Sequence, residues 1–412
     1  MADPGVLFVH NFYQQPGGED SVLLAESTML RERGHLVEQY VVHNADIEGM
    51  SKTSLLKATL WNSATSASLG KALDGEGIRV AHFHNTFPLI SPAGYYAARR
   101  RNIRVVQTLH NYRLLCPTAN FFRNGGLCEQ CLGQPVPWPA VVHGCYRDSR
   151  AATAAVAGML TVHRAIGTYA RMVDVYIALS QFARRKFIEG GLPAEKIVVK
   201  PNFSEDPGMG RHASGRVLFV GRLTREKGVE DLLSAWQLVV ARRPGWKLTI
   251  LGDGPCRSLM NGGTDTVEWL GWQPRGEVIR HMQDAALLVF PSVQREGFPM
   301  TIVEAFATGL PVLTTSFESM IELVKDGYAG RHYRHSDPRD LANVLDQMLG
   351  DEAALRALGR QAREEYEARY TPARNYEQLM AIYGTTSERV MNEATAQRAR
   401  GVAVSVSEED EA

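Results

Sequence analysis

The apolar and polar positions of the first half of the chain alternate between strand-like runs and helical stripes. Val6–Val9 is a short apolar run, and a Gly17-Gly18 turn follows it. Over residues 21–33 the apolar positions recur at helical spacing, and the helix is expected to stop at Gly34. Such alternation predicts a parallel sheet with helices on its faces. Further strands are expected at 36–42, 79–83, 103–109, 175–179 and 197–203.

A second alternating block begins with the apolar run at 217–220. Between the two blocks, residues 204–216 hold three glycines and a proline and break both periodicities, which indicates a linker. We therefore expect an α/β protein of two doubly wound, Rossmann-like domains, with ligands bound at the carboxyl ends of the strands. The second domain's other strands are expected near 247–251, 267–270, 286–290 and 311–315, followed by helix over 353–382.

The boundaries that follow are 1–203 for the first domain and 204–369 for the second. Residues 386–412 lose apolar content and contain four consecutive acidic residues at 408–411, so they are expected to form a disordered acidic tail.

Composition narrows the class of protein. The 412 residues include 45 Lys+Arg and 45 Asp+Glu, so no net field recruits nucleic acid. The cluster Arg99–Arg101 with Arg104 is either the solvated end of a helix or a contact with a membrane or an acceptor. The first residues lack a charged signal-peptide start, and no apolar run approaches the roughly 20 residues of a membrane span. A cytoplasmic protein, at most peripherally membrane-associated, is expected.

The most informative run holds two carboxylates, Glu296 and Glu304, on either side of a Gly-Phe-Pro turn. Pro299 suits the first position of a helix that should end at Gly309. The free N–H groups of a first helical turn bind anions, and carboxylates accept hydrogen bonds from hydroxyls. A nucleotide-sugar combines these two chemistries.

A basic turn follows the strand at 217–220. It runs from Gly221 to Gly228 and contains Arg222 and Lys227. These cations could grip a diphosphate and stabilise the charge of a departing nucleoside diphosphate. A solvated loop is the other reading. The turn 252–255 is interpreted as structural.

Polar groups also follow strands of the first domain. Gly17 and Gly18 lie at a turn where backbone could approach a ligand closely. His84-Asn85 and His110-Asn111 follow apolar strands at the edge that should line the cleft. His110 is the stronger candidate, although histidines at such places are often structural.

Four of the five cysteines fall within the segment 110–150, which is rich in Gly, Pro and Asn. Their spacing includes a Cys-x2-Cys pair and permits a structural zinc site, with His143 as a substitute ligand, or reduced thiols without a metal. Four thiolates leave no open position, so a catalytic metal is not expected. The four are Cys116, Cys128, Cys131 and Cys145; Cys256 is expected to be a plain buried thiol.

Taken together, these motifs resemble the retaining glycosyltransferases of family four, which have the GT-B fold. The resemblance runs from about residue 6 to 383 and is most specific from Phe290 to Val312. The run His110 to Pro117 is similar to a subgroup with a four-cysteine segment after a His-Asn-Tyr-Arg motif. The resemblance implies two domains facing across a cleft and a last helix, 370–385, that crosses back to pack on the first domain.

The resemblance also implies roles in the second domain. Arg222 and Lys227 would hold the donor's phosphates, Glu304 the ribose hydroxyls, and Glu296 the hydroxyls of the donor sugar. Trp272 lies where relatives hold the nucleobase. The backbone that would assist Glu296 belongs to Gly297, Phe298, Pro299 and Met300.

In the first domain, the resemblance places His110 beside the anomeric carbon and Gly18 near the phosphates. The implied activity is transfer of a hexosyl-type sugar from a nucleotide-sugar, a UDP-sugar in the first instance, with retention and without a catalytic metal. The acceptor would be a hydroxyl of a polysaccharide or lipid-linked intermediate, or of a small natural product. The alternatives are a phosphorylase or an epimerase of the same fold, and a non-catalytic subunit that binds nucleotide-sugar.

Overall fold

The computed structural model describes residues 4–14, 17–212, 215–262 and 265–384. These residues fold into two compact units. The N-terminal unit holds residues up to 119, 129–200 and those from Tyr376 on, and the C-terminal unit holds 120–128 and 201–375. The acidic tail expected at 386–412 lies outside the described residues.

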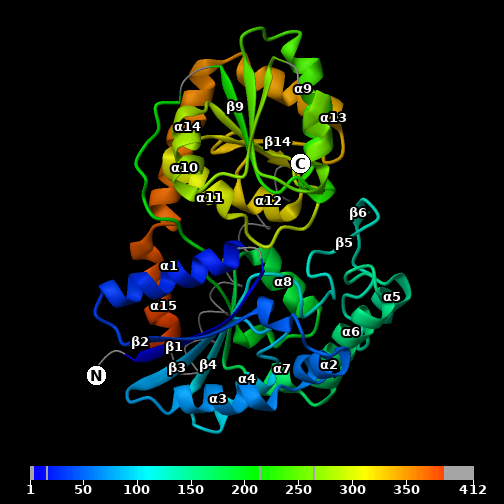
Figure 1. Ribbon diagram of the computed structural model, residues 1–412. Coiled ribbons are helices and arrows are strands. Elements are labelled where there is room, and N and C mark those ends of the chain that lie inside the picture. The colour runs from blue at the N-terminus through cyan, green and yellow to red at the C-terminus, as the bar shows by residue number, and fades with distance from the viewer. Residues whose placement is uncertain (1–3, 15–16, 213–214, 263–264, 385–412) are drawn as a thin grey trace, which may run out of the picture. The chain divides into compact units, whose positions relative to one another are not determined.

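The N-terminal unit is built on a parallel sheet of six strands in the order β2-β1-β3-β4-β7-β8 (Figure 1). Every residue of β4 but the first is buried, because helices cover both faces of the sheet. The strands are β1 Gly5–Phe12, β2 Val37–His43, β3 Ile78–Asn85, β4 Arg104–Leu109, β7 Val175–Ala178 and β8 Ile197–Val199.

Helices α1 and α15 pack on one face of this sheet and α3 and α4 on the other (Figure 1). The helices of the unit are α1 Gly18–Glu32, α2 Lys52–Leu60, α3 Ser63–Leu73, α4 Ala93–Arg99, α5 Trp138–His143, α6 Arg150–Ala165, α7 Thr168–Arg171 and α8 Gln181–Glu189. The last helix, α15 Pro372–Gly384, contributes its residues from Tyr376 on, and Tyr383 Oη lies 2.7 Å from His82 Nδ1.

The C-terminal unit has a second parallel sheet, in the order β11-β10-β9-β12-β13-β14. Its last strand, β14, had not been predicted from the sequence. The strands are β9 Arg216–Val220, β10 Lys247–Leu251, β11 Val267–Gly271, β12 Leu287–Phe290, β13 Val312–Thr315 and β14 Gly330–Tyr333. A small antiparallel hairpin, β5 Phe122–Arg123 with β6 Gly126–Leu127, groups with this unit.

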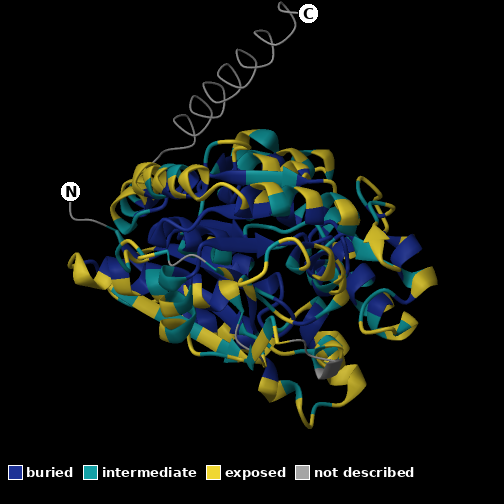
Figure 2. Cartoon of the chain, turned by 90° about the horizontal axis from the view of Figure 1, so that it is seen from above, coloured by how far each residue is buried: buried dark blue, intermediate teal, exposed yellow. Residues whose placement is uncertain are grey.

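Two apolar cores fill the C-terminal unit, one on each face of its sheet. One core packs α9 and α13 against the sheet, and the other packs α10, α11 and α12. The central strands β12 and β13 are buried throughout, whereas the edge strand β11 has two exposed residues; most of the exposed residues in Figure 2 lie on helices and loops. The helices are α9 Val229–Val240, α10 Arg275–Asp284, α11 Met300–Thr308, α12 Glu318–Leu323, α13 Pro338–Leu349 and α14 Glu352–Arg369.

In each sheet the strand order reverses at one place, and ligands of doubly wound folds bind there, at the carboxyl ends of the strands. The reversal lies between β1 and β3 in the N-terminal unit and between β9 and β12 in the C-terminal unit. The segments that follow these four strands are therefore where a site is expected.

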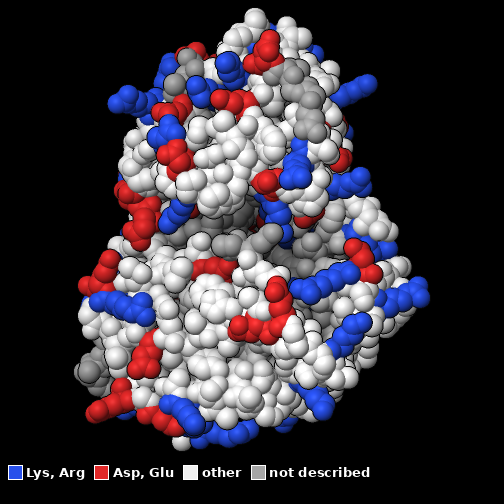
Figure 3. Space-filling view, viewed as in Figure 1, with Lys and Arg blue, Asp and Glu red and all other residues white. Residues whose placement is uncertain are grey.

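Charged side chains of both signs are interspersed over the face shown in Figure 3. The arginine cluster near residue 100 also has acidic groups beside it. Arg99 pairs with Asp174 at 2.7 Å, and Arg101 pairs with Asp74 at 2.7 Å. These two arginines therefore have acidic partners within their own unit.

Candidate active-site residues

Glu296 is the centre of a hydrogen-bonded cluster in the C-terminal unit. Its Oε1 accepts from Lys227 Nζ at 2.7 Å, from Ser292 Oγ at 2.6 Å and from Gln294 Nε2 at 3.0 Å. Burial by itself would raise the pKa of Glu296, but the Lys227 ammonium and these hydrogen bonds outweigh burial and hold the pKa below its ordinary value. The side chain is therefore a charged acceptor.

The reversal of strand order brings Lys227 and Glu296 together. Lys227 lies in a 3₁₀ turn, Arg225–Lys227, after β9, and Glu296 follows β12. Val293 N donates to Glu226 O at 2.9 Å and joins the two loops. A Cβ on Gly228 would come within 2.0 Å of Pro291 O, so only glycine permits this approach.

Glu304 forms a second carboxylate site on α11. Its Oε1 accepts from Arg275 Nε at 3.0 Å, and Arg275 Nη2 also donates to Ser204 Oγ at 3.3 Å. Burial raises the pKa of Glu304 above its ordinary value, and the Arg275 guanidinium offsets part of that rise. Arg275, at the start of α10, had not been predicted from the sequence.

Helix α11, which carries Glu304, begins one residue later than expected. Pro299 is the N-cap residue in extended conformation, and the first helical residue is Met300. The prediction of Pro299 at the first helical position is therefore wrong. The predicted stop is confirmed, because Gly309 caps the helix with a φ of 75°.

Other predicted donor-side residues lie at the ends of neighbouring strands. Arg222 follows β9 and is exposed, and Trp272 follows β11 with 73% of its surface exposed. The turn at Gly252 packs backbone on backbone, since an added Cβ would come within 1.9 Å of Gly221 O. That close approach accounts for glycine at this position.

Histidines line one face of the sheet in the N-terminal unit. His10 on β1 and His82 on β3 are completely buried, and His84 lies two positions beyond His82 on the same face. His110 follows β4, and its Nε2 lies 2.9 Å from His84 Nδ1. The two rings stack with centroids 5.0 Å apart. The structure thus brings together both predicted histidines.

Two acidic groups on α1 complete this cluster. Glu26 Oε1 accepts from Lys200 Nζ at 2.8 Å, and its Oε2 lies 3.5 Å from His84 Nε2. Lys200 and Glu26 are both buried. Burial lowers the pKa of His84 well below its ordinary value and lowers that of His110 to about 3, helped by neighbouring cations. Both rings are neutral near pH 7.

The Gly17-Gly18 turn opens α1 as expected. Gly17 is the N-cap residue, and its N–H donates to Asp20 Oδ2 at 2.8 Å. The other Asp20 oxygen lies 2.6 Å from His10 Nε2. Next to it, Glu19 accepts from Asn111 Nδ2 at 3.3 Å, and burial raises the pKa of Glu19 to about 7.

Two groups of side chains are candidates for binding a metal ion. Among the described residues, the ligand atoms of Glu26, His82 and His84 lie within 4.8 Å of one another. The Lys200 ammonium already supplies the positive charge there, and both ring nitrogens of His82 are within 2.8 Å of hydroxyls. We therefore do not interpret this group as a cation site.

The four cysteines of the 110–150 segment are thiols and not disulfides. Of the described residues, no three cysteines bring their sulfur atoms within 4.8 Å. Cys116 Sγ lies 3.1 Å from Thr118 Oγ1, and Cys131 Sγ donates to Pro137 O at 3.9 Å. This geometry does not fit an assembled thiolate site, and the zinc ion stays a prediction from spacing.

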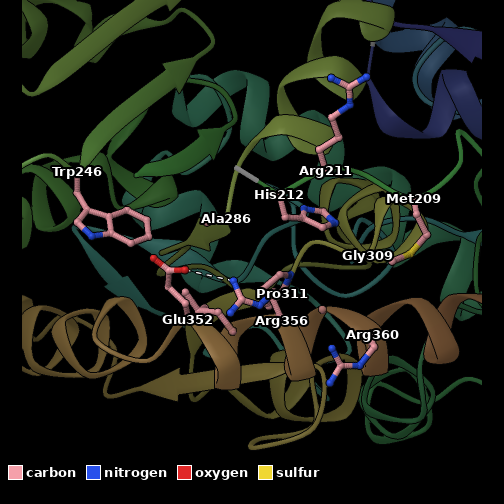
Figure 4. Close-up of a pocket in the computed structure, with 12 residues that line it drawn as sticks. Met209, Arg211, His212, Trp246, Ala286, Gly309, Pro311, Glu352, Arg356 and Arg360 are labelled. Atoms are coloured by element: carbon pink, nitrogen blue, oxygen red, sulfur yellow. Dashed lines mark hydrogen bonds and ion pairs between the residues drawn. The ribbon is translucent and has the colours of Figure 1, made fainter. Parts of the chain in front are cut away.

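A pocket of about 190 Å³ in the C-terminal unit lies away from these residues (Figure 4). Trp246, Ala286 and Pro311, which line it, each directly precede a strand. The pocket is therefore at the amino edge of the sheet, opposite the edge that carries Lys227 and Glu296. In Figure 4, Glu352 pairs with Arg356 at its rim.

Solved structures share the architecture of the two units. HepE from Anabaena, solved in complex with UDP and glucose, matches 93% of this chain and 100% of its own, with a TM-score of 0.67 and 17% identity. Two parallel, Rossmann-like halves of this kind define the GT-B fold, and this chain has that fold.

Family models cover both halves of the chain. Residues 16–204 match the model described as Glycosyltransferase Family 4, and residues 211–365 match Glycosyl transferases group 1. The chain therefore contains a family 4 glycosyltransferase domain followed by a group 1 domain. Among the described residues, none of the helices combines the length and apolar character needed to cross a bilayer.

Curated relatives match about half of this chain. The exopolysaccharide phosphotransferase SCO2592 of Streptomyces coelicolor is 29% identical over 47% of this chain and 21% of its own length. The putative colanic acid biosynthesis glycosyltransferase WcaL of Escherichia coli K12 is 30% identical over 48% of this chain and 53% of its own. The chain thus spans between a fifth and about half the length of these relatives.

Proposed function

We propose that this chain transfers a hexosyl-type sugar from a nucleotide-sugar to a hydroxyl of a polysaccharide or lipid-linked intermediate. The donor that we propose first is a UDP-sugar, since HepE was solved with UDP. The acceptor class rests on the names of SCO2592 and WcaL, which concern exopolysaccharide and colanic acid. We place the reaction in the cytoplasm, where nucleotide-sugars are made.

One observation carries the proposal. At the strand-order reversal of the C-terminal unit, a lysine and a charged carboxylate, Lys227 and Glu296, lie 2.7 Å apart. The ammonium suits a diphosphate, and the carboxylate suits sugar hydroxyls, so the pair matches the junction between the two parts of the donor. Arg222 would add a second cation and Glu304 the contact to the ribose.

In the proposed reaction the bond between the anomeric carbon and the diphosphate oxygen breaks, and a bond to the acceptor oxygen forms on the same face. The acceptor's proton goes to the departing diphosphate. Arg222 and Lys227 stabilise the charge that accumulates on that leaving group. Retention and independence from a metal are parts of this proposal. Trapping a glycosyl-enzyme, or loss of turnover in chelator without unfolding, would contradict them.

Thermal unfolding with a panel of nucleotides tests the binding step. The wild type and Glu304→Ala are melted with UDP, GDP, ADP, dTDP and their sugars. A ligand at about 100 times its Kd adds roughly 2.7 kcal/mol, or several degrees for domains of this size. A shift with one base that Glu304→Ala loses names the donor. If no nucleotide shifts the melting temperature, the transferase proposal fails in favour of a scaffold or a phosphorylase.

A further inference from the structure

A row of polar groups, three of them buried and the last half-buried, runs through the N-terminal unit from Lys200 to His110. The steps are Lys200 Nζ to Glu26 Oε1 at 2.8 Å, Glu26 Oε2 to His84 Nε2 at 3.5 Å, and His84 Nδ1 to His110 Nε2 at 2.9 Å. It joins four parts of the unit, which are the segment after β8, helix α1, strand β3 and the segment after β4. Nothing in the reaction proposed above uses Glu26, His84 or Lys200.

The contact between Lys200 and Glu26 determines which atom carries the proton in the contact between Glu26 and His84. Glu26 Oε1 forms a buried ion pair with Lys200 Nζ at 2.8 Å, in which the carboxylate is the acceptor. A carboxylate only accepts hydrogen bonds. Glu26 Oε2 and His84 Nε2 lie 3.5 Å apart, and neither atom has a hydrogen bond within the part of the chain that the structure describes. A carboxylate oxygen at 3.5 Å repels a bare nitrogen lone pair and attracts an N–H, so it favours the tautomer of His84 with the proton on Nε2.

The position of the proton on His84 then determines which nitrogen donates in the contact between His84 and His110. His84 is neutral, because burial lowers its pKa well below the ordinary value. A neutral imidazole with a proton on Nε2 has a bare Nδ1 that accepts. The partner of that Nδ1 is His110 Nε2, which must carry a proton. His110 is also neutral, with a pKa of about 3, so its own Nδ1 is bare.

Neighbouring groups do not offer a competing arrangement. His82 Nδ1 lies 4.0 Å from Glu26 Oε2, but it has the Tyr383 hydroxyl at 2.7 Å, and His82 Nε2 has the Thr108 hydroxyl at 2.8 Å. His10 Nε2 is paired with Asp20 at 2.6 Å. Hydroxyls both donate and accept, so His82 imposes no tautomer on the row.

We propose that Lys200, Glu26 and His84 are positioning residues that fix the tautomer of His110, so that His110 meets its ligand with a bare Nδ1 as a hydrogen-bond acceptor. This deepens the transferase proposal and rests on it only for the nature of the ligand, a sugar hydroxyl. It assigns His110 to holding a hydroxyl. This arrangement excludes proton donation from His110 Nδ1 to the leaving diphosphate, because that nitrogen carries no proton.

The tautomer can be read directly by long-range ¹H–¹⁵N correlation NMR of the ligand-free, histidine-labelled full chain at pH 7.5. His163 is an internal reference, because its Nε2 faces Leu60 O at 2.8 Å and a carbonyl only accepts. We expect His110 to show the same Nε2–H pattern as His163. An Nδ1–H or doubly protonated His110 in the wild type overturns the proposal without any variant.

Variants then test the row itself. His84→Phe removes the acceptor, and His110 should become a mixture of tautomers. His84→Asn restores an acceptor near the Nδ1 position and should recover the Nε2–H form. His163→Asn perturbs an equally buried histidine of the same unit and should leave the His110 signal unchanged. A His110 signal that stays fixed in His84→Phe contradicts the proposal.

A kinetic measurement separates positioning from folding. In His84→Phe, kcat should fall about tenfold, the value of one lost hydrogen bond, while the KM for the donor changes little. His84→Asn should recover part of kcat. If the spectra show the fixed tautomer but no sugar is transferred to any acceptor, the transferase proposal fails and the tautomer assignment stands. If sugar is transferred but His110 lacks the Nε2–H tautomer, the tautomer assignment fails and the transferase proposal stands.

Discussion

Lys227 Nζ lies 2.7 Å from Glu296 Oε1, so the proposed phosphate-binding cation is joined to the proposed sugar-binding carboxylate. The two groups act on each other. The lysine is one of the groups that hold the pKa of Glu296 low, and the carboxylate holds the ammonium in place. Removing either one should therefore change the behaviour of the other.

The first prediction concerns Lys227→Met. Loss of the ammonium should lower kcat by about 10²- to 10³-fold, since a preorganised charge at the leaving group contributes that much. The pKa of Glu296 should rise at the same time, so activity should fall off at a higher pH on the acid side than in the wild type. Pre-steady-state rates over pH 5–8 measure both effects. Lys247→Met, an exposed lysine of the same unit, is the matched control; equal rates in the two variants would refute the assignment.

The second prediction concerns Arg275→Ala. Burial raises the pKa of Glu304, and the Arg275 guanidinium offsets part of that rise. Without Arg275 the carboxylate should take up a proton at a higher pH and cease to accept from ribose hydroxyls. As the pH is lowered, UDP binding should therefore begin to weaken at a higher pH in the variant than in the wild type. Calorimetric titrations at several pH values measure this difference. Arg280→Ala, on the same helix and paired with the exposed Glu277, should leave the pH dependence unchanged. Coincident curves for Arg275→Ala and wild type would remove the role of Arg275.

Much of the fold could be predicted because its signals are local. Apolar runs bounded by Gly and Pro mark β1, β9 and β12, and the linker at 204–216 breaks both periodicities. Strand β14 was missed because Arg331 and His332 interrupt its apolar pattern. The helical stretch 353–382 is two helices, α14 and α15, separated near Tyr370 and Thr371. The pattern of charged and apolar residues does not predict so short an interruption between two helices.

The candidate site could be predicted only where its residues stand in one run or directly after a strand. Glu296, Glu304 and His110 meet that condition. Lys200 and Glu26 do not, since they are 174 positions apart in the sequence and meet only in the fold. One signal could have indicated the histidine face. His82 and His84 alternate within the run 80–84, which is otherwise apolar, and a buried polar residue needs a partner.

The third prediction concerns glycines of the C-terminal unit. Gly252→Ala should be strongly destabilising, because its Cβ would lie 1.9 Å from Gly221 O and its φ is 136°. Gly271→Ala is the control, with a φ of 67° and nothing within 4 Å of the added Cβ. It should cost only the left-handed backbone penalty of about 1–2 kcal/mol. Melting temperatures of both variants measure the difference, and a Gly252→Ala as stable as Gly271→Ala would show that the turn relaxes freely.

The fourth prediction concerns Glu19, whose pKa of about 7 in the folded chain exceeds its ordinary value of 4.5 because the side chain is buried. A carboxyl with a raised folded-state pKa favours folding in its protonated form. Its contribution to the free energy of unfolding is therefore intact below pH 4.5 and is lost as the pH rises through 7. At pH 8 the loss is at most about 3 kcal/mol, from 1.36 kcal/mol for each pKa unit.

Glu19→Gln keeps the shape of the side chain and removes its titration. Its melting temperature should exceed that of the wild type by several degrees at pH 8 and match it near pH 4.5, as about 2–4 °C for each kcal/mol implies. Glu32→Gln changes an exposed carboxyl at the other end of α1 and should behave as the wild type at both pH values. A Glu19→Gln protein that is less stable than the wild type at pH 8 would mean that the charged carboxylate has a partner that stabilises the fold, and that its hydrogen bonds with Tyr13 and Asn111 outweigh the burial.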